Sequence, residues 1–417
     1  MDASTLSRIK QSFDHVPETD TRATSMGPRE LLITLVFSFV RDAEKRTIAS
    51  LRRNVIGKTG KTPGRSNFRE RLATKRLQKF LIEAVRHLAQ AFAGQLKVGI
   101  DLAQLLGVLA IFFLDSTSTT LPDGAAAEFP GTRKNVAPAA FKWHTCFNLL
   151  DGVVGWFKMT EGTSHDRKSF PPLPMLAGAL IIFDLGYWDY QLLIDLAAAN
   201  VFFLSRVKSN AIVRVVEVID GLPKRSTEGR NLFDLDLSVK KKAIVEFIGQ
   251  LGSGKKTFDV RVIGFWNKSS RTYHWYLTNL LVPAKVIYPL YRLRWQIELL
   301  YKSCKASLRL ADMPSGHPQI IRNMLLLTVV ATLIAQPLAR IMVNGLSFTK
   351  QGAMSVQRAA MVMVEVADEF RLYILKGGQT LANILLTKLE LFTPELIDPN
   401  HLNRDSSFNR VANIMLN

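Results

Sequence analysis

The spacing of hydrophobic residues divides the chain into helical and strand-like regions. Apolar side chains recur three and four positions apart in residues 29–51 and 67–92, which predicts helical segments. The glycine-containing stretch 52–71 has a single acid and predicts a basic loop between them, suited equally to binding phosphates and to a solvated linker. Residues 319–342 and 356–389 are again mostly helical in pattern.

The middle of the chain has the pattern of an α/β core. The apolar run 108–114 stops at Asp115 and a Ser/Thr-rich turn, which indicates a short buried strand that ends in a carboxylate. A second apolar run, ALIIF, ends at Asp184, and a helical stretch, 187–199, and another strand, VFFL, follow it. The order strand, helix, strand is typical of an α/β fold.

Residues 209–273 change to the alternating pattern of strands. Three such runs, AIVRVVEVIDG, KKAIVEFIG and TFDVRVIGFWN, predict an all-β insertion in the α/β core. Within it, GQLGSGKK nearly matches a phosphate-binding loop, but Lys256 occupies the Ser/Thr position of that motif, so we predict a hairpin turn. The run WYLTNLL then predicts a further strand.

The charge of the chain indicates which class of partner it binds. The 417 residues include 54 Lys and Arg against 35 Asp and Glu, and the net charge of +19 favours a polyanion, most commonly nucleic acid. An anionic membrane surface is the alternative, but the longest apolar run, 324–335, is shorter than the roughly 18 residues that span a bilayer, so we predict a buried core helix there. With two Cys and no apparent secretory signal, we expect an intracellular chain without a disulfide framework or a cysteine-based zinc site.

The segment YRLRWQIELLYKSCK, residues 291–305, has one acid among four basic and three aromatic residues. On a continuous helix, Tyr291, Arg294, Glu298 and Lys305 share an arc of roughly 60°, so one face presents a hydroxyl, two cations and a carboxylate. A solvated face with ion pairs between residues four apart explains this pattern without any catalytic function.

Two upstream carboxylates favour a catalytic interpretation. Asp115 and Asp184 both end buried strands, and neighbouring strands lie roughly 4.8 Å apart. Three carboxylates that converge without a metal repel each other, whereas with Mg²⁺ they form a hard oxygen site. A pair of such ions suits phosphodiester chemistry. Glu298 is then a metal ligand, while Arg294 and Lys305 bind DNA phosphates.

The spacing Y-(2)-R-(3)-E-(6)-K of this segment resembles the signature of the IS4-type DDE transposases of bacterial insertion sequences. The stretches FLDST, IIFDLGYW, TEGTSHD and YLTNLL support the resemblance, which covers roughly residues 60–340. It implies an α/β, RNase H-like catalytic core with an all-β insertion between the second Asp and the Glu, flanked by helical N- and C-terminal regions. One departure is Leu185, which stands where the second Asp motif often has a basic residue that contacts phosphate.

The resemblance also implies roles for individual residues. The catalytic and metal-binding triad is Asp115, Asp184 and Glu298, and the cofactor is a pair of Mg²⁺ ions, with Mn²⁺ as a substitute. The residues that hold DNA phosphates near the cleaved end are Tyr291, Arg294 and Lys305. Trp295 is a candidate for stacking on an unpaired base, and core packing is the alternative.

The implied activity is metal-dependent cleavage at the ends of an insertion sequence, through a hairpin intermediate, followed by strand transfer. The implied partners are double-stranded DNA, as terminal inverted repeats and target, and a second copy in a homodimeric synaptic complex. We expect a bacterial cytoplasmic, nucleoid-associated protein that binds no membrane. The alternatives are an inactive or domesticated DNA-binding relative and a metal-dependent nuclease of the same fold.

The predicted organisation has five parts. They are a helical, basic DNA-binding region (1–95), the first part of the core (96–208), the β-rich insertion (209–273), the second part of the core with the signature helix (274–345) and a helical C-terminal region (346–417).

Overall fold

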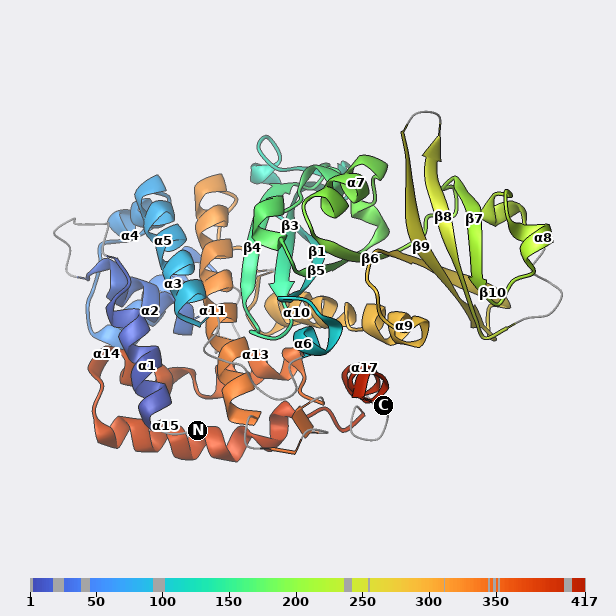
Figure 1. Ribbon diagram of the computed structural model, residues 1–417. Coiled ribbons are helices and arrows are strands. Elements are labelled where there is room, and N and C mark those ends of the chain that lie inside the picture. The colour runs from blue at the N-terminus through green and yellow to red at the C-terminus, as the bar shows by residue number, and fades with distance from the viewer. Residues whose placement is uncertain are drawn as a thin grey trace. The chain divides into compact units, whose positions relative to one another are not determined.

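The chain forms two compact units, each built from separate stretches of sequence (Figure 1). The computed structural model describes residues 3–17, 26–38, 46–92, 102–235, 242–253, 256–310, 312–343, 346–347, 350–351, 353–400 and 407–416. Unit 1 comprises Met1–Gly99, Ser116–Ser164 and Gln296–Arg404, and unit 2 comprises Ile100–Asp115, His165–Trp295 and Asp405–Asn417.

Unit 1 is mainly helical. Its helices are α1 (Ala3–Asp14), α2 (Pro28–Ser38), α3 (Ile48–Thr59), α4 (Arg65–Leu72), α5 (Lys75–Phe92), α10 (Trp295–Ala306, in this unit from Gln296), α11 (Pro318–Val343), α13 (Val356–Glu365), α14 (Ala367–Lys376) and α15 (Gln379–Phe392). Its strands are β2 (Pro130–Arg133), β3 (Ala137–Asn148) and β4 (Val154–Glu161). Strand β3 pairs antiparallel with β2 and β4, and the distal part of β1 (Ile111–Thr120) lies beside it.

Helix α11 is the core helix of unit 1. The stretch Pro318–Arg340 is apolar and long enough to cross a membrane, but 89% of its most apolar window is buried inside the structure. It packs along α5, and the two helices lie side by side in Figure 1. Two of its amide side chains donate to backbone carbonyls inside the core: Asn323 to that of Leu72 at 2.8 Å, and Gln336 to that of Val356 at 2.8 Å. The predicted buried core helix is confirmed.

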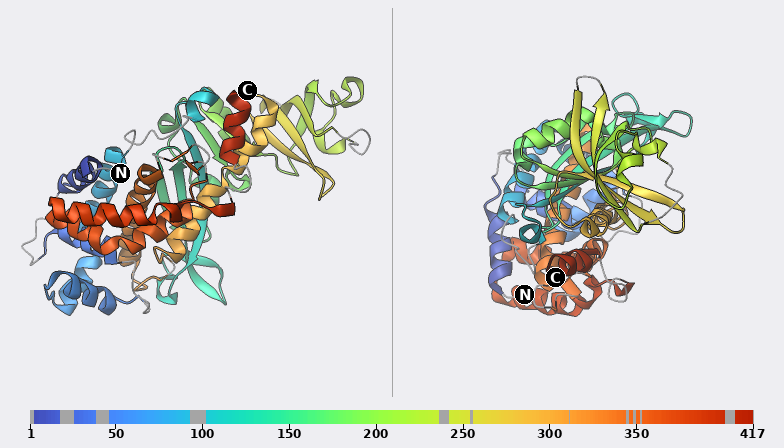
Figure 2. Two further views of the ribbon diagram at one scale, coloured as in Figure 1. Left: turned by 90° about the horizontal axis from the view of Figure 1, so that it is seen from below. Right: turned by 45° about the vertical axis from the view of Figure 1, so that its right-hand side comes forward.

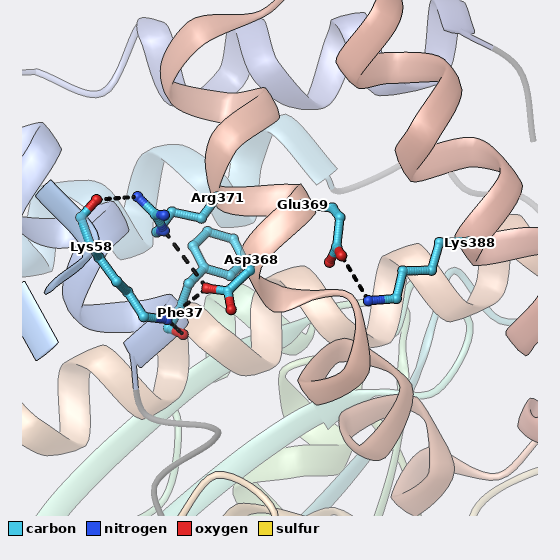
Figure 3. A network of polar contacts seen from close by, with 6 residues as sticks. All are labelled: Phe37, Lys58, Asp368, Glu369, Arg371 and Lys388. Atoms are coloured by element: carbon cyan, nitrogen blue, oxygen red, sulfur yellow. Dashed lines mark hydrogen bonds and ion pairs between the residues drawn. The ribbon is translucent and has the colours of Figure 1, made fainter.

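Ionic contacts join the N-terminal and C-terminal helices of unit 1 (Figure 3). Near the end of α3, the Lys58 ammonium lies 2.8 Å from Oδ1 of Asp368 in α14. Arg371 donates to the carbonyl of Lys58 at 3.2 Å, and Lys388 of α15 pairs with Glu369 at 2.8 Å. The end of α3 is therefore fixed to α14 by both a side chain and a backbone carbonyl.

Unit 2 is built on a sheet with a parallel and an antiparallel part. The first half of β1, β5 (Leu180–Phe183) and β6 (Phe202–Arg206) are parallel neighbours. The sheet continues through the antiparallel strands β10 (Thr272–Thr278), β9 (Lys256–Asn267), β8 (Ile244–Ser253) and β7 (Val213–Asp220). These outer strands are strongly twisted in the right-hand view of Figure 2. The helices of unit 2 are α6 (Leu102–Leu106), α7 (Tyr190–Ala198), α8 (Lys224–Thr227), α9 (Ala284–Arg292) and α17 (Ser407–Leu416).

The predicted RNase H-like fold class is confirmed. Strand β1 lies beside β3, which pairs antiparallel with β4, and these three are followed along the chain by β5 and β6, which are parallel to each other and have α7 between them. Between the second Asp and the Glu, strands β7, β8 and β9 fall within the predicted β-rich insertion, residues 209–273, and β10 extends past its end to Thr278. Among the residues described there, the short helix α8 and a 3-10 turn at Leu232–Asp234 depart from an all-β content. The GQLGSGKK segment joins β8 to β9, whose register pairs Ser253 with Lys256, as predicted for a hairpin.

Two predicted elements were wrong. The stretch 52–71 is not a basic loop: α3 and α4 cover most of it, because a Thr47–Ser50 capping box starts α3 and Gly60, at φ 71°, ends it. The strand predicted to stop at Asp115 continues to Thr120, since Ser and Thr fit a half-exposed strand as well as a turn. Asp115 therefore lies within β1, where the burial of the strand changes from complete to partial.

Candidate active site

Asp115 and Asp184 lie next to each other on neighbouring parallel strands of unit 2. The register of β1 and β5 pairs Leu114 with Phe183, so the next residues are both aspartates: Asp115 within β1, and Asp184 directly after the end of β5. Parallel neighbours are separated by roughly 4.8 Å and point side chains in matching position to the same face. The register of β5 and β6 continues this row to Arg206, a cation that the sequence interpretation missed. Its signal in the sequence is a basic residue two positions after the VFFL run.

Arg294 holds the carboxylate of Asp115. Its Nη1 lies 2.6 Å from Oδ2, and the two side chains are only 13% and 17% exposed. An ion pair with so little water around it interacts more strongly than a surface pair, and the loss of one partner leaves the other poorly solvated. The predicted DNA-binding Arg294 is thus placed on a predicted metal ligand.

Tyr291 holds the second aspartate. Its hydroxyl donates to Oδ1 of Asp184 at 3.4 Å, and the backbone N–H of Leu185 donates to the same oxygen at 2.8 Å. Burial raises the pKa of Tyr291 to about 12, with the Asp184 carboxylate adding to the rise and the Arg294 guanidinium opposing it. The phenol therefore stays protonated at neutral pH and acts as a hydrogen-bond donor.

The signature segment is not one continuous helix, so the predicted four-residue arc was wrong. Helix α9 ends at Arg292 and α10 begins at Trp295. At the junction the N–H groups of Leu293 and Arg294 donate to carbonyls three residues back, at 3.1 and 3.0 Å, which tightens the chain. No residue at the junction is a helix breaker. The ion pair of Arg294 with Asp115 is a tertiary contact, which the spacing of hydrophobic residues along the sequence cannot indicate.

Helix α10 carries the remaining signature residues. Glu298 is half-buried, and it lies seven residues before Lys305, so the two share a face of α10. Nζ of Lys305 donates to the carbonyl of Ser118 in the distal part of β1 at 2.7 Å. Burial lowers the pKa of Lys305. Another side of the helix packs into the core, where Ile297, Leu300 and Cys304 are buried.

Trp295 is 58% exposed. This exposure rules out core packing, which was the alternative explanation of an aromatic residue here. Stacking on a base stays a prediction.

The aspartate pair has the chemistry of a site for a hard divalent cation. Adjacent carboxylates on the same face of a sheet supply oxygen ligands of the type that Mg²⁺ prefers. In the part of the chain that the structure describes, no group of three or more His, Cys, Asp or Glu residues is arranged to hold a metal. Arg294 and Tyr291 occupy oxygens of the two aspartates instead.

Comparison with known proteins identifies the family. Residues 107–334, more than half of the chain, match the transposase DDE domain family. The chain belongs to the DDE transposase family. The resemblance to the IS4-type transposases of insertion sequences is thereby confirmed.

Several transposases are similar to the chain at low identity. A putative transposase, y4zB, of Sinorhizobium fredii is 26% identical over 229 residues, which are 54% of this chain and 59% of that protein. The transposase of the element IS231E of Bacillus thuringiensis is 26% identical over 283 residues, with 56% and 59% covered. The chain spans about three fifths of the length of these curated relatives. A piggyBac transposase, solved as a synaptic complex with hairpin DNA, aligns with 95% of this chain and 83% of its own at 10% identity and a TM-score of 0.43.

This DDE transposase also has a basic surface on its N-terminal helices. Arg65 and Arg69 lie four residues apart on α4, and Lys75 and Lys79 lie four apart on α5, so each pair shares a face. All four are exposed. Asn323 of α11 fixes the α4–α5 turn, because its amide donates to the carbonyls of Leu72 at 2.8 Å and Thr74 at 3.2 Å. We call these four residues the α4–α5 basic face.

Proposed function

We propose that this chain is an active DNA transposase, which cuts DNA at the ends of an insertion sequence and joins the freed 3′ ends to target DNA. The observation that carries the proposal is the alignment of Asp115 with Asp184 on parallel strands, with Tyr291 and Arg294 of the signature in contact with them. Membership of the DDE transposase family supports it.

In this proposal, Asp115 and Asp184 bind the divalent cation and Glu298 is the third ligand. When bound, Mg²⁺ supplies the positive charge that an in-line displacement at a phosphodiester requires, and Mn²⁺ substitutes for it. Arg294 orients Asp115 and offsets its charge while the cation is absent, and Tyr291 does the same for Asp184 through a neutral hydrogen bond.

DNA is the partner that the charge of the chain favours. Arg294, Lys305 and Tyr291 bind phosphates near the cleaved end, and the exposed Trp295 stacks on a base that a hairpin intermediate leaves unpaired. The α4–α5 basic face binds the duplex of the terminal repeats. Strand transfer brings two DNA ends together, so we include a homodimeric synaptic complex and a nucleoid-associated location in the proposal.

Substitution of the three acids tests the proposal. We expect Asp115→Asn, Asp184→Asn and Glu298→Gln each to lower Mg²⁺-dependent cleavage by about a thousandfold, since each removes several kcal/mol of charge stabilisation. The assay uses a supercoiled plasmid that carries both flanks of the gene, and a gel shift shows whether DNA binding is retained.

The matched control is Glu217→Gln, an exposed acid on β7 of unit 2, which should cleave as the parent does. A variant of the three that still cleaves at the parent's rate contradicts the role of that residue. A parent that binds the flanks without cutting them points to the inactive relative. Cleavage without any joined product points to the nuclease.

A further inference from the structure

The connection from β10 into α9 is fixed by a set of polar side chains that the proposed mechanism does not use. It covers residues 279–283, directly before the helix that carries Tyr291. The contacts come from four side chains, which we call the α9 clamp: Glu246, Arg261, Thr278 and Asn279. All of its residues belong to unit 2.

Beyond the end of β10, the side chain of Asn279 continues the hydrogen bonding that the backbone of the strand makes within the sheet. The ladder between β10 and β6 ends with Thr278 opposite Leu204. Oδ1 of Asn279 then accepts the N–H of Phe203 at 2.8 Å, and its Nδ2 donates to the carbonyl of Val201 at 3.0 Å. The amide group satisfies backbone groups of Phe203 in β6 and of Val201 just before it, so the chain can turn out of the sheet without leaving them unpaired.

Arg261, in the β-rich insertion, forms hydrogen bonds to the same connection. It lies on β9, and its Nε is 2.7 Å from Oε1 of Glu246 on β8. Its Nη1 donates to the carbonyls of Leu280 at 2.9 Å and Val282 at 2.7 Å. The Arg261 and Glu246 side chains are only 12% and 15% exposed. The planar guanidinium makes these contacts in several directions at once, which a lysine ammonium on a single flexible stem cannot reproduce.

A second contact braces the helix beyond the clamp. The buried ring of Tyr276 on β10 lies 5.0 Å from that of Tyr291 and 6.2 Å from that of Tyr288, between ring centroids. Tyr276 of β10 therefore contacts α9 at Tyr288 and at the signature tyrosine, Tyr291.

We propose that Arg261 is a positioning residue for the catalytic site: together with Asn279 it fixes the start of α9 and thereby sets Tyr291 against Asp184 and Arg294 against Asp115. The inference rests on the proposed function. A helix transmits a shift of its first turn along its axis, and the contact of Arg294 with Asp115 is only 2.6 Å long. A displacement of about 1 Å is enough to lower the rate of such a site a hundredfold. The insertion thus takes part in the geometry of the aspartate pair without contacting it.

The test compares Arg261→Lys with Arg271→Lys, an exposed arginine in the turn between β9 and β10. Hydrogen exchange by mass spectrometry follows the peptide of α9, with the peptide of β6 as internal reference. We expect Arg261→Lys to speed exchange in α9 only, and to weaken Mn²⁺ binding, measured by EPR without DNA, by about tenfold, as loss of outer-shell support does. Arg271→Lys should change neither quantity. Glu246→Gln keeps a hydrogen-bond acceptor for Arg261, so it should change the exchange of α9 and the affinity for Mn²⁺ by less than Arg261→Lys does.

Unchanged exchange in α9 overturns the inference, whatever the activity of the protein. Faster exchange with unchanged Mn²⁺ binding and cleavage also overturns it, because Arg261 then stabilises α9 without positioning the site. If the parent and Asp115→Asn bind Mn²⁺ equally and neither cuts DNA, the proposed function fails. That outcome is separate, because the exchange data still decide whether Arg261 fixes α9. If Arg261→Lys does not fold, Glu246→Gln and Asn279→Asp serve as the test variants.

Discussion

In the proposed mechanism, Arg294 and a divalent cation both bind the carboxylate of Asp115. In the variant Arg294→Met, that half-buried carboxylate loses its cation, so we expect a fall of about 1–3 kcal/mol in the free energy of unfolding. Millimolar Mg²⁺ should restore more stability to this variant than to the parent, since ligand binding to the folded state stabilises it. Thermal unfolding with and without Mg²⁺ measures both effects.

The double variant Arg294→Met with Asp115→Asn is the control for this comparison. It contains no charge at either position. Mg²⁺ should therefore raise its unfolding temperature by no more than it raises the unfolding temperature of the parent. An equal response to Mg²⁺ in all three proteins would contradict a cation site at Asp115.

At the level of residues, the sequence indicated the two aspartates but not their contacts. A carboxylate directly after a buried apolar run is visible in the letters around Asp115 and Asp184. The contacts from Arg294 and Tyr291 depend on the strand register and on the end of α9 at Arg292, which are tertiary features. Arg206 was missed for the same reason.

At the level of elements, long periodic segments were predicted well and their ends were not. Helix α5 and strand β9 follow patterns of period 3.6 and 2 that extend over ten or more residues. The break after Arg292 and the extension of β1 beyond Asp115 fall on residues whose propensity permits either outcome. Tertiary contacts decide such positions.

Gly264 provides a prediction about the β-rich insertion. It lies opposite Trp275 in the ladder of β9 and β10, and a Cβ at this glycine would be 2.7 Å from Cε3 of the indole. We expect Gly264→Ala to lower the free energy of unfolding by about 1–3 kcal/mol, because the indole has to move in a packed layer. Urea denaturation measures the change.

Gly57 is the control for this glycine. It lies in α3 with no atom within 4 Å of a Cβ position, so Gly57→Ala should stabilise instead, by about 0.5–1 kcal/mol. If Gly264→Ala costs as much in a Trp275→Leu background as in the parent, the indole is not the cause.

At the level of the whole molecule, the net charge of +19 predicts DNA binding that weakens steeply with salt. Arg69→Ala combined with Lys79→Ala removes a cation from each helix of the α4–α5 basic face. The slope of log K against log salt should fall by about 1.8, close to 0.9 for each lost phosphate contact. Fluorescence anisotropy on duplex flanks of the gene measures the slope.

Lys376→Ala is the control for the salt dependence, since it removes an exposed cation at the end of α14. An unchanged slope in the double variant would mean that the α4–α5 basic face does not contact phosphate. An equal fall of the slope in Lys376→Ala would mean that DNA binding depends on the net charge of the chain and not on the α4–α5 basic face.

The alternation of the two units along the sequence has a consequence for truncated copies of the gene. Each unit is assembled from three stretches, and unit 1 requires both Met1–Gly99 and Gln296–Arg404. A premature stop codon within the insertion removes residues from both units. Such a fragment lacks α14, which anchors the end of α3 through Lys58, and also α11, which fixes the α4–α5 turn through Asn323. We therefore expect nonsense mutations to yield chains that proteases degrade, and not stable DNA-binding fragments that inhibit an intact copy.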